Sequence, residues 1–276
     1  MTYMILGWWH RRDCPLAGST ARDAGKPVHN ARMIVRADED SYVLINQHDH
    51  AQLARDIVAA MRTEPALLGA RRDLVLHATR EHDNGWLETD AQPTITEAGR
   101  PCDFIEGPAP VKHEIWPRGI ARAGNLDPRV GALVAEHALT VYAYRRQESE
   151  WLPFFTSVSA LRDALLRDAR VDTEMALREF RMEYRCVRLG DSFSLQFCNG
   201  WTDPQDTLGY RAALRGSRLF ISPDPFDGVA IPLQVPARRI AGRMYRDDED
   251  LRAAVDAAAP ELLIGEARGV QDITSV

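Results

Sequence analysis

A histidine and an aspartate stand side by side at His82 and Asp83, and Gly85 follows them closely. Neutral imidazole binds zinc, iron, copper and nickel, whereas carboxylate favours harder ions, so the pair suits a divalent or trivalent transition metal. The two oxygens of Asp83 could also bridge a pair of metal ions of the kind used in phosphate chemistry. The pair predicts a metal-dependent enzyme and leaves its substrate open.

Helical spacing places His82, His137 and Asp191 on faces that should be buried. The apolar residues on these faces are Val75, Ala78 and Trp86 for the first, Val130 and Val141 for the second, and Phe180, Tyr184, Val187, Leu195 and Cys198 for the third. An ionised carboxylate in such a position costs several kcal/mol unless a cation or hydrogen-bond donors satisfy it. Buried polar groups on separate helices are most easily satisfied together, and a metal ion would do that.

Each of these residues also has a structural interpretation. A single histidine on an apolar face is most often hydrogen-bonded to a backbone carbonyl, and Asp191 could pair with Arg185 or Arg188 across one helical turn. His113 fits a surface position as well as a buried one, because Pro117 should interrupt its helix. The coincidence of several such residues, and not any one of them, favours a metal site.

The pattern between residues 47 and 200 is mostly helical. The predicted helices cover residues 51–62, 73–86, the region after 110, 127–145, 158–168 and 173–198. Proline and glycine cluster between residues 91 and 110 and predict a long loop, which inside a compact domain tends to be functional.

The two ends of the chain are predicted to form strands. Two β-rich runs, 34–36 and 42–45, flank acidic residues and indicate a hairpin, while 218–222, 229–235 and 239–245 indicate short strands before a helix at 248–258. A lone hairpin is marginal in water, so we expect it to pair with the C-terminal strands. The predicted fold is mainly α, a helical bundle with a small β-sheet formed by the N-terminal hairpin and the C-terminal strands.

This pairing predicts a single domain over residues 31–276. Its helical core covers about 47–200 and its α+β part about 201–276, and residues 1–30 form a flexible tail because no periodicity survives there.

Composition limits the classes of function. The chain has 276 residues, is 45% apolar and carries a net charge of −6 without basic blocks, which argues against nucleic acid as a partner. Its four cysteines are scattered and typical of a reducing compartment, and no apolar stretch could span a bilayer. We expect a cytoplasmic protein that uses a small-molecule substrate, with its oligomeric state open.

The ordered set of polar residues resembles that of the HD-domain superfamily of metal-dependent phosphohydrolases. The set consists of His50, His82, Asp83, His113, His137 and Asp191. The segment Leu76-His-Ala-Thr-Arg-Glu-His-Asp-Asn-Gly85 is similar to the helix end that carries the HD pair in that superfamily. From about residue 33 onward, the chain also resembles a bacterial family known only as a domain of unknown function.

The resemblance implies an HD-like helical fold and a metal-dependent hydrolase that acts on a phosphate ester or another small metabolite. His50, His82, Asp83 and Asp191 would hold one metal, and His113 and His137 would complete a second position or bind phosphate. The metal would be one or two ions of Fe, Mn, Ni or Zn.

The resemblance also suggests catalytic residues and two alternative functions. Arg80 and Arg188, with Arg100 as a further candidate, would offset developing negative charge, and Asp90 or a nearby glutamate would accept a proton. One alternative is an HD-like di-iron oxygenase, which would use all six ligands. The other is a non-catalytic helical binding protein.

Overall fold

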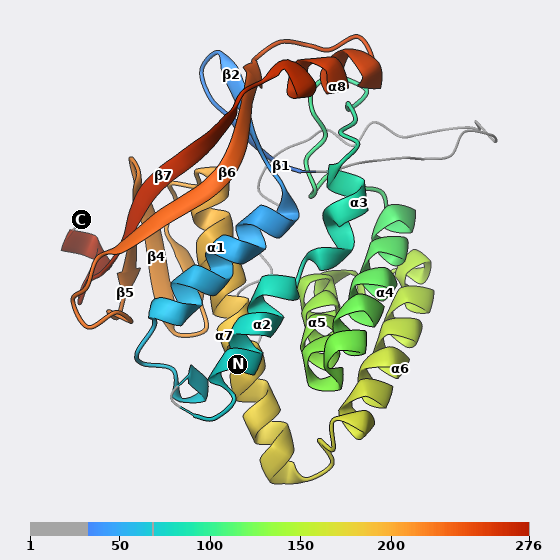
Figure 1. The fold of residues 1–276 in the computed structure, drawn as a ribbon, viewed down its shortest axis with the longest axis vertical. Coiled ribbons are helices and arrows are strands. Elements are labelled where there is room, and N and C mark those ends of the chain that lie inside the picture. Colours follow the sequence, from blue (N-terminus) through green and yellow to red (C-terminus); the bar gives the residue numbers. More distant parts are fainter. Residues whose placement is uncertain (1–32, 68, 276) are drawn as a thin grey trace.

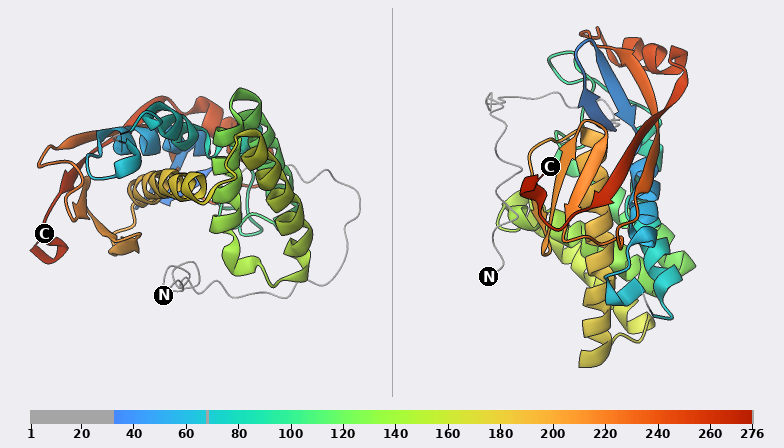
Figure 2. Two further views of the ribbon diagram at one scale, coloured as in Figure 1. Left: turned by 90° about the horizontal axis from the view of Figure 1, so that it is seen from below. Right: turned by 90° about the vertical axis from the view of Figure 1, so that its left-hand side faces the viewer.

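A computed structural model describes residues 33–67 and 69–275 of the chain. The predicted tail at residues 1–30 lies outside these described residues. Helices α4, α5 and α6 stand together on one side of the molecule, the sheet lies on the other, and α1, α2 and α7 run between them (Figure 1). A view from the sheet side shows α7 passing behind the strands (Figure 2).

Seven strands form one sheet within the described residues, in the order β1-β2-β6-β7-β5-β4-β3. Strands β5 and β7 are parallel, and all other neighbours are antiparallel. The strands are β1 (Ile34–Ala37), β2 (Ser41–Ile45), β3 (Gln205–Thr207), β4 (Tyr210–Arg215), β5 (Arg218–Ser222), β6 (Ile231–Ala241) and β7 (Pro260–Gly269). The predicted hairpin is confirmed as β1 and β2, and it pairs with the C-terminal strand β6 as expected.

The prediction of a mainly α fold with a small sheet is wrong. The structure is 53% helical and 20% strand, and its strands form a sizeable half-barrel. The sequence pattern does not reveal β3, β4 or β7. Alanine, glycine and glutamate in β4 and β7 have low strand propensity, so pairing with neighbouring strands stabilises these segments and local preference does not.

Two prolines in strand β6 explain why the sequence predicted shorter strands there. The sequence predicts two separate strands at 229–235 and 239–245, but the structure has one continuous strand that contains Pro232 and Pro236. The part of β6 that holds both prolines pairs with β7, whereas β2 pairs with β6 only from Arg238 to Ala241. One backbone edge is therefore open at each proline, which lacks an N–H to donate.

Most helices lie close to their predicted positions, although α6 begins at Leu152, ahead of the predicted start at 158, and α3 was not predicted. The helices are α1 (Gln47–Ala60), α2 (Arg72–Glu81), α3 (Leu87–Asp90), α4 (Ala109–Leu126), α5 (Pro128–Val141), α6 (Leu152–Asp168), α7 (Glu174–Asn199) and α8 (Asp248–Ala257). The helix predicted at 73–86 is shorter and ends at Glu81, before His82. A separate 3₁₀ turn follows over Asn84–Trp86. Pro117 lies inside α4 without interrupting it, contrary to the prediction.

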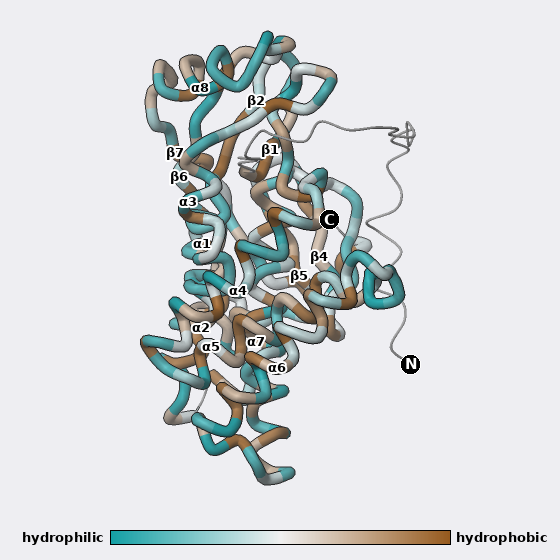
Figure 3. The backbone as a smooth tube through the Cα atoms, turned by 90° about the vertical axis from the view of Figure 1, so that its right-hand side faces the viewer, coloured by the Kyte–Doolittle hydropathy of each residue, from teal (hydrophilic) through white to brown (hydrophobic). Residues whose placement is uncertain are grey.

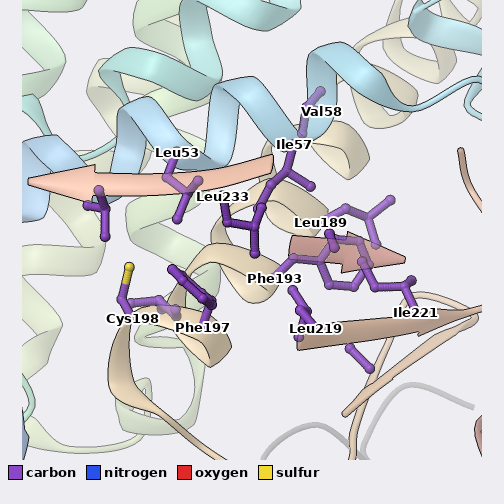
Figure 4. Packing of buried hydrophobic residues seen from close by; sticks show 14 of the residues in the cluster. Leu53, Ile57, Val58, Leu189, Phe193, Phe197, Cys198, Leu219, Ile221 and Leu233 are labelled. Atoms are coloured by element: carbon purple, nitrogen blue, oxygen red, sulfur yellow. The ribbon is translucent and has the colours of Figure 1, made fainter. Parts of the chain in front are cut away.

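The largest apolar core lies between α1, α7 and the sheet. Leu53 and Ile57 of α1 point toward Phe193 of α7, and Leu219 of β5 and Leu233 of β6 close the cluster from the sheet (Figure 4). The helices carry both hydrophilic and hydrophobic residues along their length, as expected for amphipathic elements (Figure 3). Among the described helices, none has the length and apolar character needed to cross a membrane.

Candidate metal centre

Five of the six predicted ligands meet where four helices converge. His50 lies in the first turn of α1, His82 and Asp83 directly follow α2, His137 lies in α5, and Asp191 lies in α7. We call these five residues the His/Asp cluster. All of them are buried. Figure 1 shows α1, α2 and α7 in the middle of the molecule, with α5 next to α2.

A glycine in α7 allows the close approach that assembles the cluster. A Cβ atom on Gly190 would lie 2.7 Å from Val58 Cγ2 and 2.9 Å from the Ala54 carbonyl oxygen of α1, and 3.0 Å from Thr79 Cγ2 of α2. Any larger residue would push α7 away from both helices. The next residue is Asp191, so this contact determines how far its carboxylate reaches toward the histidines.

The nitrogen atoms of the histidines point at the two carboxylates. His50 Nε2 lies 2.8 Å from Asp83 Oδ2, and His82 Nε2 lies 3.3 Å from the same oxygen and 3.5 Å from Asp191 Oδ1. His137 Nε2 lies 3.9 Å from Asp191 Oδ2. Two triads, His50–His82–Asp83 and His82–His137–Asp191, each have potential ligand atoms within 4.8 Å of one another, and they share His82.

Hydrogen bonds on the far side of two rings fix which nitrogen faces the cluster. His82 Nδ1 donates to the Thr79 carbonyl oxygen at 2.6 Å. His50 Nδ1 lies 2.9 Å from Ser194 Oγ, and this hydroxyl donates its own hydrogen to the Asp191 carbonyl oxygen at 3.1 Å. The hydroxyl therefore accepts a hydrogen from His50, and in the neutral form of each ring the Nε2 lone pair faces the carboxylates.

This donor set fits a metal ion. A lone pair that faces a carboxylate is repelled unless a proton or a cation lies between them. Across the described residues, neither His82 Nε2 nor His137 Nδ1 has a hydrogen-bond partner, although both atoms are buried. Imidazoles oriented by a hydrogen bond from the other ring nitrogen are the usual form of a metal-binding histidine. Three imidazoles and two carboxylates suit a transition metal.

The pKa values of His82 and His137 are shifted in opposite directions by their surroundings. Burial raises the pKa of Asp83 and of Asp191, but neighbouring cationic groups outweigh burial and hold both pKa values below their usual range. Burial lowers the pKa of His82, yet the charges of the two carboxylates raise it to about 10. Burial lowers the pKa of His137 to about 3. Without metal, His82 therefore carries a proton between two carboxylates, and a bound metal would displace it.

A cavity of about 50 Å³ opens beside the cluster, with Asp83, His137 and Asp191 in one wall. Two cationic side chains also line it. Arg188 Nη1 donates to Asp191 Oδ2 at 2.6 Å, which leaves Oδ1 facing His82. The volume corresponds to about three or four water molecules, so the space next to the carboxylates accepts only a small chemical group.

Lys112 is the second cation of this cavity and is almost fully buried, with 3% of its surface exposed. Its Nζ donates to the Ile105 carbonyl oxygen at 3.1 Å and lies 5.5 Å from the centre of the Tyr142 ring. Aromatic side chains form much of the remaining wall, namely Trp86, Phe104, Trp116, Tyr142 and Tyr144. Positive charge held in a largely apolar wall attracts an anionic ligand.

Three predicted site residues lie elsewhere. The His113 ring contacts Trp151, with 4.9 Å between ring centres, and stacks on Phe154 at 5.3 Å, so the structure does not bring it into the cluster. Arg80 pairs with the neighbouring Glu81 and is not part of the cavity wall. Asp90 is buried but lines a different cavity.

Lys112, Ser194 and Gln47 belong to the site but were not predicted from the sequence. Lys112 lies four residues before Trp116 on a buried face of α4, so the helical spacing that selected the histidines would also have selected it. Ser194 lies three residues after Asp191 and orients His50. The Gln47 side chain is buried in the cavity wall, and no sequence signal distinguishes it from a surface residue near a helix start.

The family comparison covers all of these residues. The model of a family described as "Protein of unknown function (DUF3891)" matches residues 33–241, and the chain belongs to that family. No curated protein and no solved structure matches the chain. The His/Asp cluster lies entirely within the matched segment, so the family match covers the candidate metal centre. The likeness to HD-domain proteins stays a resemblance.

Proposed function

We propose that this chain is a metal-dependent hydrolase that acts on a small phosphate ester. The observation that carries the proposal is the convergence of three imidazoles and two carboxylates beside a cavity lined by two cations, the buried Lys112 and the half-buried Arg188. The order of the cluster residues along the chain, with its resemblance to HD-domain phosphohydrolases, supports the same chemistry.

Different residues would bind the metal and the substrate. His50, His82, Asp83 and Asp191 would hold a metal, with His137 beside them. Such a metal acts as a Lewis acid and lowers the pKa of a bound water, so that hydrolysis proceeds at neutral pH. The candidate metals are Fe, Mn, Ni and Zn.

Lys112 and Arg188 would bind the anionic oxygens of the substrate and offset charge that develops during hydrolysis. The aromatic wall would exclude bulk water, which strengthens both of these charge interactions.

The alternative functions have less support. A di-iron oxygenase of the HD-like type would use six ligands, but His113 packs against Trp151 and Phe154 away from the cluster. A non-catalytic binding protein would give no role to the two buried triads of potential metal ligands that share His82. The hydrolase is therefore the proposal.

Metal analysis combined with a phosphate-release assay tests the proposal. Protein purified without chelator is analysed by plasma mass spectrometry, and nucleotides and sugar phosphates are screened for released phosphate. We expect one or two equivalents of Fe, Mn, Ni or Zn, lost in His82→Ala together with phosphate release. Two irons without phosphate release would favour the oxygenase, and no metal after reconstitution would reject both enzymes.

A further inference from the structure

A second, larger cavity lies on the other side of the start of α1. It has a volume of about 380 Å³ and is bounded by the first turn of α1, the end of α3, helix α8 and strand β6. It shares no lining residue with the cavity beside the His/Asp cluster. Its size falls in the range of small-molecule sites in proteins, which is about 300–1,000 Å³.

One wall of this cavity is acidic. Asp90 is 5% exposed, and its Oδ2 accepts the Gln47 backbone N–H at 2.6 Å. Its Oδ1 is buried and has no hydrogen-bond partner among the described residues. Asp49, whose Oδ2 accepts from Asn46 Nδ2 at 2.7 Å, lies in the same wall. A buried carboxylate oxygen without a donor is destabilising, so this wall favours a ligand that brings hydrogen-bond donors and positive charge.

The cavity is also lined by two arginines, Arg238 of β6 and Arg252 of α8, and by the exposed Asp256 of α8. Arg238 Nη1 donates to the backbone carbonyl oxygens of Val255 and Ala258, and Arg252 Nε donates to that of Pro93 at 3.2 Å. These acceptors are neutral and do not compensate the guanidinium charges. Arg252 also forms an ion pair with Asp248, whose Oδ2 lies 3.7 Å from its Nη2, so part of its charge is shared with that carboxylate. Both guanidinium groups therefore retain donors for an anionic ligand, and guanidinium binds carboxylate well.

We propose that this cavity is a second ligand site and that it takes a small zwitterion with one ammonium group and one carboxylate. The ammonium group donates to Asp90 Oδ1 and faces Asp49, and the carboxylate accepts hydrogen bonds from Arg238 and Arg252. A simple cation would leave the arginines unused, and a simple anion would leave Asp90 unsatisfied. A ligand that carries both charges, such as a free amino acid, satisfies the acidic and the basic groups together.

The site lies next to the metal centre without being part of it. Gln47 connects the second cavity with the metal centre. Its backbone N–H donates to Asp90, while its side chain lines the cavity beside Asp83. The proposal goes beyond the proposed hydrolase, and zwitterion binding is measured independently of metal content and of phosphate release.

Isothermal titration calorimetry on the full chain tests the proposal. The probes are the twenty free L-amino acids, each titrated alone, followed by the amide and the N-acetyl derivative of any that binds. We expect at least one to bind saturably with one site per chain, and each derivative, which lacks one of the two charges, to bind at least tenfold more weakly. Absence of saturable binding by all twenty, or equal binding of the derivatives, would overturn the proposal.

Variants assign the binding to this cavity. Asp90→Asn keeps an acceptor for the Gln47 N–H and removes the negative charge. Arg252→Gln replaces the guanidinium group with a shorter, neutral amide. Each should weaken binding at least tenfold, whereas Arg243→Gln, which changes an arginine paired with Asp250 outside the cavity, should leave it unchanged. Unchanged binding in the first two variants would overturn the assignment. If Asp90→Asn does not fold, Arg252→Gln decides.

Discussion

At the scale of single residues, the site depends on which atom of each side chain is left free. Hydrogen bonds from His50 and His82 to Ser194 and Thr79 use one ring nitrogen each and direct the other toward the carboxylates. Arg188 uses Oδ2 of Asp191 and leaves Oδ1 for the histidines. These hydrogen bonds orient three of the five cluster residues, so that their remaining ligand atoms face one another.

Asp191→Asn tests whether that carboxylate is a ligand. The amide has the same shape and can still accept from Arg188, but it is a poor metal ligand, so we expect metal content to fall at least tenfold while the protein stays folded. Plasma mass spectrometry and circular dichroism measure the two properties. Asp163→Asn, at an exposed position in α6, is the matched control. Full metal content in Asp191→Asn would show that Asp191 is a structural carboxylate.

Lys112→Met tests the anion-binding role of the buried lysine. Methionine fills a similar volume without the charge, so the fold and the metal content should be retained. We expect the KM for a phosphate substrate to rise, or kcat/KM to fall, by about tenfold or more, which corresponds to about 1.4 kcal/mol of lost binding. Steady-state kinetics with the best substrate of the screen gives the answer. Unchanged kinetics would leave Lys112 with a packing role only.

At the scale of elements, the close approach of α7 to α1 and α2 determines the geometry of the cluster. Gly190→Ala would introduce a Cβ within 2.7–3.0 Å of atoms in both neighbouring helices, one of them the backbone oxygen of Ala54. We expect a loss of about 1–3 kcal/mol in the free energy of unfolding, and weaker metal binding. Urea denaturation measures the first effect. Gly69→Ala, where a Cβ meets no atom within 4 Å, should leave stability unchanged.

The loop before α4 is joined to β1 through Asp103. Its carboxylate accepts from the backbone N–H groups of Val35 and Ile105, and burial raises its pKa to about 6. The folded state then holds the proton to a higher pH than the unfolded state, whose pKa is near 4. Its contribution to stability is present below about pH 4 and is lost as the pH rises through about 6.

This titration has a measurable amplitude. The carboxylate is only partly buried, so solvent screening reduces the expected change to roughly 1–2 kcal/mol. Asp103→Asn should remove that part of the decline in the free energy of unfolding between pH 4 and pH 6, as followed by urea denaturation. The difference between wild type and variant isolates Asp103 from other titrating groups. Parallel profiles for the two proteins would contradict the assignment.

At the scale of the whole molecule, the cluster joins parts of the chain that are far apart in sequence. His50 and Asp191 lie in α1 and α7, whose contact forms the largest apolar core, and His137 joins them from α5. A metal ion would therefore link the helices that support the sheet to those of the helical side. Binding to the folded state alone stabilises a protein by mass action.

Metal removal should consequently destabilise the protein. We expect chelation to lower the Tm, and re-addition of the native metal at about 100 times its Kd to restore about 2.7 kcal/mol of stability. Differential scanning calorimetry of chelated and reconstituted protein measures this, and the His82→Ala variant should show no response. A Tm that does not change with metal would show that metal binding at the cluster does not stabilise the folded protein.

The sequence by itself determined the members of the cluster but not their arrangement. Helical spacing selected His82, His137 and Asp191 because burial follows a 3.6-residue period that can be read along one helix. His113 joined the predicted set through the resemblance to HD-domain proteins, but Pro117 does not interrupt α4 and the His113 ring packs against Trp151. Local spacing shows which face is buried, but not which neighbour the face meets.

Tertiary structure alone decided the size of the sheet and the position of Asp90. Strands β4 and β7 have little strand propensity of their own and are held by pairing, β4 with the adjacent β3 and β5, and β7 with β5 and β6, which lie well before it in the chain. Asp90 faces a separate cavity because α3 ends beside α8 and β6, a contact between segments some 150 residues apart. Long-range packing sets such contacts, and no period in the sequence records them.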